Sequence, residues 1–325
     1  MKSRLLWGGA ALLFLLGMPP GVGQLLPHRG HPMAHTWPLL AGVEPHFITS
    51  ITDGRDFWPG FSPDGMWVLF SRMADGDHWE LVRVPVSGGR TEKLIRSQVT
   101  ISATRASWSP KNDLIAFTGT SAPGNAAIWI VNSDGTGAHA LSGSGLSEMF
   151  YPSWYPDGSQ LAAMDGRNLV IKRFDLAGGA AVTVTDHAKV LTGKPSVSPD
   201  GRWIAFAGQQ NAGQPYDQEQ NVIWVVGEGG ALSTLEAIPV QGRSPAWSPD
   251  GTRLAFESDR GSDEGRYAVF VIGRDGRGLI QITDYNLNAT HPAWSPDGKR
   301  LVFDAQDPRS KNVFGIAIID APLVK

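Results

Sequence analysis

Residues 292–298 read Pro-Ala-Trp-Ser-Pro-Asp-Gly, and this stretch decides the fold together with the alternating run Arg300-Leu301-Val302-Phe303 that follows it. Proline presets the φ angle at the second position of a type I turn, and aspartate is well suited to the third. Glycine then takes the left-handed conformation that completes a three-residue hairpin with a bulge. A short strand therefore ends at Trp294, and a second strand begins just after Gly298.

The same corner recurs along the chain at intervals of 43 to 50 residues, as Ser62-Pro63-Asp64-Gly65, Ser109-Pro110-Lys111-Asn112, Tyr155-Pro156-Asp157-Gly158, Ser198-Pro199-Asp200-Gly201, Ser248-Pro249-Asp250-Gly251 and Ser295-Pro296-Asp297-Gly298. A period in the forties with strand-like content is typical of propeller blades. The second corner has Asn112 where the others have glycine. Because asparagine tolerates a positive φ better than most residues, we predict the same left-handed turn there.

Each repeat predicts four strands. An inner strand precedes the corner, an alternating strand such as 254–256 follows it, a third strand such as 268–271 comes next, and an Asp-Gly turn leads to the fourth. We therefore predict an all-β, six-bladed propeller of four-stranded antiparallel blades. Large rings just before the corners are expected to pack between neighbouring blades, namely Phe61, Trp108, Trp154, Trp247 and Trp294.

The last repeat ends near Ile318 without a fourth strand. Residues 46–52 resemble the fourth strand of the fifth repeat, 279–284, so we expect them to supply the outer strand of blade six. This pairing would close the ring and remove an open sheet edge. The predicted boundaries are a signal peptide at 1–23, a leader at 24–45, the propeller at 46–320 and a tail at 321–325.

The N-terminus has the pattern of a secretory signal peptide: Lys2 and Arg4, an apolar run from Leu5 to Leu16, and small residues at 21–23. The alternative is a membrane anchor, but the apolar run is shorter than the roughly 20 residues that span a bilayer. The sequence has no cysteine. We expect a mature protein without a stable membrane anchor, located in a periplasm or outside the cell, and a monomer. The formal net charge of −3, with no basic block, argues against a nucleic-acid partner.

The repeats at 245–251 and 254–261, with their Asp-Gly turn and closing Ile-Thr, resemble those of the TolB C-terminal propeller family. The resemblance extends from about residue 46 to residue 320 and implies a propeller that acts as a binding module. Similar repeats occur in the propellers of prolyl-oligopeptidase-like and dipeptidyl-peptidase-IV-like enzymes and of oligogalacturonate lyases. TolB proteins carry an α/β domain before the propeller, for which the leader at 24–45 is too short.

Motifs for catalysis, metals and cofactors are missing from the sequence, which has no Gly-x-Ser-x-Gly elbow, no His-Glu-x-x-His and no thiolate ligand. We therefore predict no catalytic residues, no metal and no cofactor. Three histidines lie in the leader, where a solvated segment is a simpler interpretation than a metal site: His28, His31 and His35. The acidic groups at 75–77 and at Asp259, Asp263 and Glu264 lack the pattern of a calcium loop, so they are interpreted as solvated turns.

The inner strands of a propeller line its central channel, so equivalent positions at their starts should meet at one channel mouth. The position before the inner-strand proline, with Arg243 from the preceding position, gives the candidate ligand-binding residues Trp58, Arg105, Tyr151, Lys194, Arg243, Ser244 and His291. No acidic residue occupies these positions. A mouth lined by one sign of charge concentrates the electric field and favours an anion. The alternative is that these cations extend into water or pair with loop carboxylates.

The sequence thus favours a non-catalytic module that binds a protein or peptide, carboxylate-rich in composition, through this mouth and the long loop at 208–221. The alternative is a propeller enzyme of the lyase, lactonase or glycan-processing kind that acts on an anionic substrate at the same mouth. A third interpretation is a structural module of the cell envelope.

Overall fold

The computed structural model describes residues 39, 42–50, 54–74, 78–95, 100–101, 105–120, 126–141, 148–227, 236–308 and 313–322. The predicted signal peptide, the leader histidines His28, His31 and His35, and the acidic group at 75–77 lie outside these residues. Of the predicted leader, only Leu39 and residues 42–45 are described.

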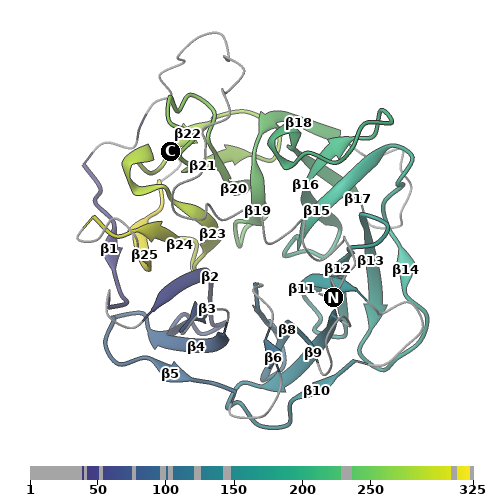
Figure 1. Cartoon of the computed structure of the whole chain (residues 1–325), viewed down its shortest axis with the longest axis horizontal. Helices are drawn as coiled ribbons and strands as arrows, with labels where there is room; N and C mark the ends of the chain where they lie inside the picture. The colour runs from purple at the N-terminus through teal and green to yellow at the C-terminus, as the bar shows by residue number, and fades with distance from the viewer. Residues whose placement is uncertain are drawn as a thin grey trace, which may run out of the picture.

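Six antiparallel sheets, formed by the described residues, surround a central axis (Figure 1). Blade one consists of β2 (Arg55–Phe61), β3 (Trp67–Met73), β4 (Trp79–Pro85) and β5 (Glu92–Lys93). Blade two has an inner strand in two pieces, β6 (Thr100–Ile101) and β7 (Ser107–Trp108), followed by β8 (Leu114–Thr120), β9 (Ala126–Asn132) and β10 (His139–Ala140). Blade three consists of β11 (Met149–Trp154), β12 (Gln160–Asp165), β13 (Val170–Asp175) and β14 (Val182–Thr183).

Blade four consists of β15 (Val190–Val197), β16 (Trp203–Gln210), β17 (Val222–Gly227) and β18 (Glu236–Gln241). Blade five consists of β19 (Arg243–Trp247), β20 (Arg253–Ser258), β21 (Ala268–Gly273) and β22 (Ile280–Gln281). Blade six takes three strands from the C-terminal end, β23 (Thr290–Trp294), β24 (Arg300–Gln306) and β25 (Phe314–Asp320). Two 3₁₀ turns, η1 (Gln218–Gln220) and η3 (Tyr285–Leu287), are the helical elements within the described ranges. No helix among the described residues is long and apolar enough to span a membrane.

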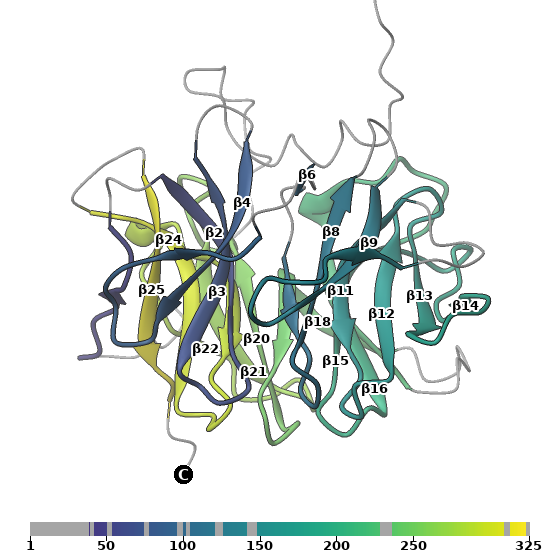
Figure 2. The ribbon, with the colours of Figure 1, turned by 90° about the horizontal axis from the view of Figure 1, so that it is seen from below.

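The ring closes as predicted, because the fourth strand of blade six is β1 (His46–Phe47) from the N-terminal side (Figures 1 and 2). His46 pairs with Ile318 and Phe47 with Ala317, and the amide of Ile48 donates to the carbonyl of Ile316 at 2.8 Å. Ile48 is buried between blades six and one, against Phe61 and Phe70 among others. The first and last blades are therefore joined by backbone pairing and by a shared core.

The predicted corners form in five of the repeats, where glycines at equivalent positions have φ between 69° and 73°: Gly65, Gly158, Gly201, Gly251 and Gly298. In four of them the serine hydroxyl donates to the aspartate two residues later, for example Ser62 Oγ to Asp64 Oδ1 at 2.5 Å. The prediction of a left-handed Asn112 is wrong, because its φ is not positive. Its backbone amide instead donates to Ser109 Oγ at 3.1 Å, and its side chain donates to the carbonyl of Gly158 at 3.1 Å.

The rings before the corners pack between blades, as the sequence predicts. Trp294 of blade six lies in a core cluster with Ala246 and Ala255 of blade five, and Trp247 packs against Ala205 of blade four. Indole N–H groups also donate to inner-strand carbonyls of the preceding blade: Trp154 to Ser107, Trp247 to Ser196 and Trp294 to Ala246. Neighbouring blades are thus held by apolar burial and by directed hydrogen bonds.

Candidate functional site

A β-bulge interrupts the inner strand of most blades at the height of the predicted mouth residues. Two residues on the inner strand face one on the second strand, between Phe57 and Gly60, Phe150 and Ser153, Thr192 and Pro195, Arg243 and Ala246, and Thr290 and Ala293. A bulge bends its strand and changes the direction of a side chain. The mouth residues of blades one, three, four, five and six lie in these bulges.

Four mouth residues have a left-handed backbone, with φ between 51° and 57°: Trp58, Tyr151, Ser244 and His291. This conformation is uncommon outside glycine and is found preferentially at functional sites. Each of the four precedes a proline, which cannot donate to the strand ladder and so fits a bulge. Blade four differs, because its bulge lies one residue earlier and Lys194 is its second residue, with no left-handed backbone.

Lys194 links several blades at the mouth. Its Nζ atom donates to Ser244 Oγ at 3.1 Å, and it lies 5.1 Å from the ring centroid of Tyr151 and 5.9 Å from that of Trp58. Desolvation, with the nearby charges of Arg243 and Arg105, outweighs the opposing effect of Glu257 and lowers the pKa of Lys194 from its ordinary 10.5 to about 8. The structure therefore brings mouth residues of blades one, three, four and five together around one ammonium group.

Arg105 joins the same group from blade two. Its Nη2 atom donates to the carbonyl of Pro292 at 3.3 Å, and desolvation lowers its pKa. Among the described residues, neither Arg105 nor Lys194 forms an ion pair with a carboxylate. These two half-buried cations are thus held by neutral partners.

Arg243 is held differently. Its Nε atom lies 3.3 Å from Glu257 Oε1, and its guanidinium lies 4.0 Å from the ring centroid of Tyr267. Glu257 is 1% exposed, and its Oε2 atom accepts a hydrogen bond from the backbone amide of His291 at 2.5 Å. Despite its desolvation, the charges of Arg243 and Lys194 and the hydrogen bond from the backbone amide of His291 hold the pKa of Glu257 below its ordinary value.

Asp304 is the second carboxylate at the mouth, and it is fully buried. It accepts hydrogen bonds from the backbone amide of Trp58 at 2.9 Å and from Thr290 Oγ1 at 2.5 Å. Desolvation raises its pKa to about 7. Glu257 and Asp304 end the apolar runs of β20 and β24, so two carboxylates from second strands lie beside the cations that the inner strands supply. The signal in the sequence was a carboxylate that directly continues an apolar strand, as in Leu254-Ala255-Phe256-Glu257.

Trp58, His291 and Asp304 form a chain of hydrogen bonds across the junction of blades one and six. Trp58 Nε1 donates to His291 Nε2 at 2.8 Å, and His291 Nδ1 lies 2.9 Å from Asp304 Oδ1. An indole nitrogen can only donate, so Nε2 of His291 carries no proton and Nδ1 donates to the carboxylate. Desolvation and the charge of Lys194 keep the pKa of His291 well below its ordinary value.

The channel mouth therefore contains three cations, Arg105, Lys194 and Arg243, and two carboxylates, Glu257 and Asp304. Positive charge is in excess even with both carboxylates ionised, and the excess lies at Arg105 and Lys194. The aromatic faces of Trp58 and Tyr151 flank Lys194. Such an arrangement can attract one anionic group and pack an apolar portion of the same ligand beside it.

The long loop of blade four reaches the mouth as the sequence suggests. Tyr216 Oη lies 3.6 Å from the position that a Cβ atom at Gly193 would occupy, directly beside Lys194 in the chain. Asn221 Nδ2 donates to Tyr216 Oη at 2.8 Å, and the backbone of Asp217 donates to Gln209 Oε1 at 2.7 Å. These bonds hold the loop together and against the end of β16, and Tyr216 brings its hydroxyl next to Gly193 of the inner strand.

Comparison with known proteins supplies the family. The family model of the TolB beta propeller domain matches residues 45–218, which is more than half of the chain. The chain belongs to the TolB β-propeller family. This result agrees with the resemblance seen in the repeats, and it covers the closing strand and blades one to three, with the start of blade four.

Similar curated proteins are an uncharacterized protein of Agrobacterium fabrum, 28% identical over 204 residues, and the uncharacterized peptidase YuxL of Bacillus subtilis, 31% identical over 163 residues. The matches cover 62% and 49% of this TolB-family chain, and 64% and 23% of the two relatives. The chain thus spans less than two thirds of the length of either relative.

Solved structures share the fold at low identity. The match to a structure assigned to TolB of Agrobacterium tumefaciens has a TM-score of 0.61 and 22% identity, covering 82% of this chain and 91% of that one. TolB from Acinetobacter baumannii gives 0.58 and 17%, covering 84% and 65%. An oligogalacturonate lyase in complex with manganese gives 0.54 and 12%, covering 86% and 96%.

The mouth does not offer a set of metal ligands. Within the ranges that the structure describes, no group of three or more His, Cys, Asp or Glu side chains is placed to hold a metal ion. Both ring nitrogens of His291 are engaged, by Trp58 and Asp304, and cations surround the ring. The donor set of the described mouth residues therefore does not fit the manganese bound by the lyase.

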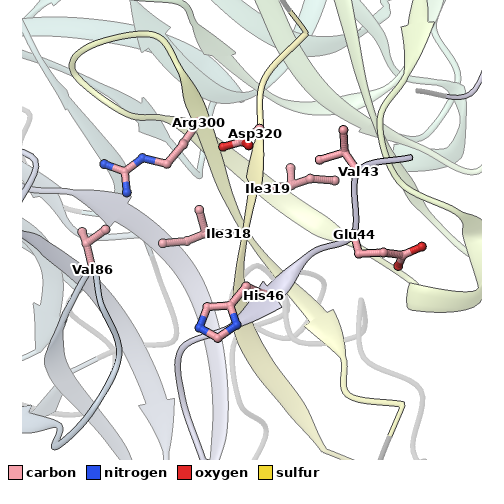
Figure 3. A pocket seen from close by; sticks show the side chains of 8 residues that line it. All are labelled: Val43, Glu44, His46, Val86, Arg300, Ile318, Ile319 and Asp320. Carbon is pink, nitrogen blue, oxygen red and sulfur yellow. The ribbon is translucent and has the colours of Figure 1, made fainter. Parts of the chain in front are cut away.

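A separate hollow of about 220 Å³ lies at the ring closure, where β1 and β25 approach Val86 of blade one (Figure 3). Its lining combines the apolar Ile318 with the charged side chains of Glu44, Arg300 and Asp320. None of the mouth residues lines it. This hollow belongs to the outer part of blade six and is distinct from the channel mouth.

Proposed function

We propose that this TolB-family propeller is a non-catalytic module that binds a carboxylate group of a protein or peptide partner at the channel mouth. One observation carries the proposal: Lys194, beside Trp58 and Tyr151, and Arg105, against the carbonyl of Pro292, lie half-buried without a carboxylate partner among the described residues. A partly desolvated cation that lacks a counter-ion lowers stability. A carboxylate on the ligand supplies that counter-ion.

The flanking rings support a peptide ligand. Trp58 and Tyr151 present apolar faces on either side of Lys194, and these faces would bury the aliphatic part of a residue whose carboxylate meets the ammonium group. The apolar run and basic residues at 1–23 support an exported protein, so the partner is proposed to be a carboxylate-rich protein of the cell envelope. A monomer is the form in which we propose that it acts.

The test is binding of a short Asp- and Glu-rich peptide, and of galacturonate, to the purified protein by calorimetry at low and high salt. We expect salt-sensitive binding that weakens at least about tenfold in Arg105→Ala/Lys194→Ala, the effect of a lost charge-assisted contact. Arg274→Ala is the matched control, because this cation stacks on Trp203, away from the mouth. Equal affinity of the double variant and the wild type would overturn the proposal.

Lys194 also favours a second candidate function, in which the protein is a lyase that cleaves a chain of anionic sugars by elimination. A lysine whose pKa is about 8 is partly neutral near neutral pH and can accept a proton, and the neighbouring Arg105 and Arg243 could neutralise a uronate carboxylate. The same galacturonate samples, with oligomers of galacturonate, would be monitored for an unsaturated product and metal content. If the wild type forms the product and Lys194→Ala does not, the enzyme is favoured. If the wild type forms no product, the binding module is favoured.

A further inference from the structure

A small pocket lies beside the channel mouth, between the loop at 208–221 of blade four and the residues of blade five at the start of β19 and the end of β20. We call it the rim pocket; its lining includes Glu219 and Asn221 from blade four and Arg243, Asp259 and Tyr267 from blade five. It encloses about 10 Å³, which is room for one group of the size of water or ammonium. Ser244, which accepts from Lys194, follows Arg243 directly, so the rim pocket adjoins the mouth.

Two buried polar atoms of residues that line the rim pocket form no hydrogen bond, Asn221 Oδ1 and Arg243 Nε, but Arg243 Nε lies 3.3 Å from the carboxylate of Glu257. Asn221 is 3% exposed, and its Oδ1 atom makes no hydrogen bond although its Nδ2 atom donates to Tyr216. A buried acceptor without a donor is unfavourable, and such groups are rare in folded proteins. The atom is therefore positioned to accept a hydrogen bond from a group that enters the pocket.

The charges of the rim pocket are mainly negative. Neither Glu219 nor Asp259 forms an ion pair with a described residue, and Glu219 receives only weak contacts of 3.3 Å from Tyr267 Oη. Desolvation raises the pKa of Glu219, and the charge of Asp259 raises it further against the opposing effect of Arg243. Arg243 is already committed to Glu257 and to the ring of Tyr267.

An ammonium group matches this pocket. It has the size of one water molecule, it carries positive charge, and it donates three hydrogen bonds, which suits Asn221 Oδ1 and the carboxylates of Glu219 and Asp259. A calcium ion would need six or more oxygen ligands, which the lining does not provide. We propose that the rim pocket binds an ammonium group of the ligand whose carboxylate meets Lys194 and Arg105. The ligand class is therefore zwitterionic: a free amino terminus or a lysine side chain close to a carboxylate. This inference rests on the proposed function.

The test uses straight-chain ω-amino acids of increasing length as probes, each matched with the carboxylic acid and the alkylamine of the same length, and affinity is measured by NMR titration. We expect one length of amino acid to bind about tenfold more tightly than its matched acid. Glu219→Gln and Asn221→Leu should each remove that advantage, and Glu219→Gln should leave the affinity for the plain acid unchanged. Glu264→Gln is the matched control, because this carboxylate pairs with Arg266 at 3.7 Å and does not line the pocket.

The outcomes separate this inference from the proposed function. Binding of plain acids without any gain from the amine would overturn the ammonium subsite and leave the proposed function standing. Binding of alkylamines alone, weakened in Glu219→Gln, would contradict the proposed function and support the subsite. If neither class binds, both are overturned. Asn221 is buried, so its replacement can impair folding. If the two variants give different results, the Glu219→Gln result is the one that tests the ammonium subsite.

Discussion

Single residues at the channel mouth are held at a cost in free energy. Trp58, Tyr151, Ser244 and His291 adopt a backbone conformation that side-chain-bearing residues rarely take, and Lys194 is a partly desolvated cation without a carboxylate partner. Left-handed residues of this kind cost on the order of 1 kcal/mol or more each. Surrounding structure must enforce such features, and proteins commonly keep them where binding or catalysis requires them.

Replacing Lys194 with methionine should stabilise the free protein by roughly 2 kcal/mol at pH 7, since the apolar side chain avoids the desolvation of a charge. Between pH 8 and 10.5 the unfolded wild type holds a proton that the folded form has released, so wild-type stability rises with pH across this window. The advantage of Lys194→Met should therefore shrink there. Urea denaturation at several pH values measures both effects.

Lys172 provides the contrast for that experiment. Its Nζ atom lies 2.7 Å from Asp165, which is 2% exposed. Lys172→Met leaves a buried carboxylate without its cation and should destabilise the protein. A similar loss of stability in Lys194→Met at pH 7 would contradict the account of an unpaired lysine.

His291 should be neutral at pH 7, with its proton on Nδ1, because Trp58 occupies Nε2 and the pKa lies well below its ordinary value. In Trp58→Phe the ring loses that donor, and its pKa should rise. Nitrogen chemical shifts of the imidazole report both the tautomer and the titration. A wild-type ring protonated on Nε2 would refute the hydrogen-bond chain.

At the scale of elements, prolines accompany the bulges of the inner strands, and tryptophans link neighbouring inner strands. The prolines at 59, 152, 245 and 292 fall within the bulges, and the bulges bring the preceding side chains together at the mouth. Tryptophans before the corners donate a hydrogen bond from the indole N–H group to a backbone carbonyl of the preceding blade's inner strand. The junction of blades one and two lacks this hydrogen bond, since Nε1 of Trp108 has no partner among the described residues.

A pair of conservative substitutions isolates this hydrogen bond. Trp247→Phe loses ring area and the 3.0 Å bond to Ser196, whereas Trp108→Phe loses ring area alone. We expect Trp247→Phe to lower the free energy of unfolding by about 1 kcal/mol more than Trp108→Phe. Chemical denaturation of the two variants measures the difference, and equal losses would show that the indole bonds do not hold the blades.

For the whole molecule, stability depends on the closure of the ring by β1. Ile48 joins blades six and one, and Ile48→Ala should lower the free energy of unfolding by about 3 kcal/mol, as for other buried isoleucines. Val182, exposed on the outer strand of blade three, is the control, and Val182→Ala should change stability by less than about 0.5 kcal/mol. A chain that begins at Gly54 should be less stable still. Thermal stability equal to that of the full chain would contradict the closure.

The sequence by itself determined the six blades, their corners and the closing strand. Turn stereochemistry is encoded in four adjacent residues, and the alternation of a strand is encoded in the next five or six. The missing fourth strand of the last repeat identified residues 46–52 as its partner. Spacing before the corner also selected residues that do converge at the mouth, among them Lys194, Ser244 and His291.

Only the tertiary structure decided the chemistry of the mouth. Glu257 and Asp304 come from second strands, and their meeting with Arg243 and His291 depends on how neighbouring strands and blades align around the axis. The conformation of Asn112 likewise depends on Gly158 in the next blade, which accepts its side-chain hydrogen bond. Local sequence fixes turns and strands because their energetics involve adjacent residues. Charge pairing at the axis instead joins residues of different strands and blades, such as His291 with Asp304, 13 positions away, and with Glu257, 34 positions away, and packing brings these together.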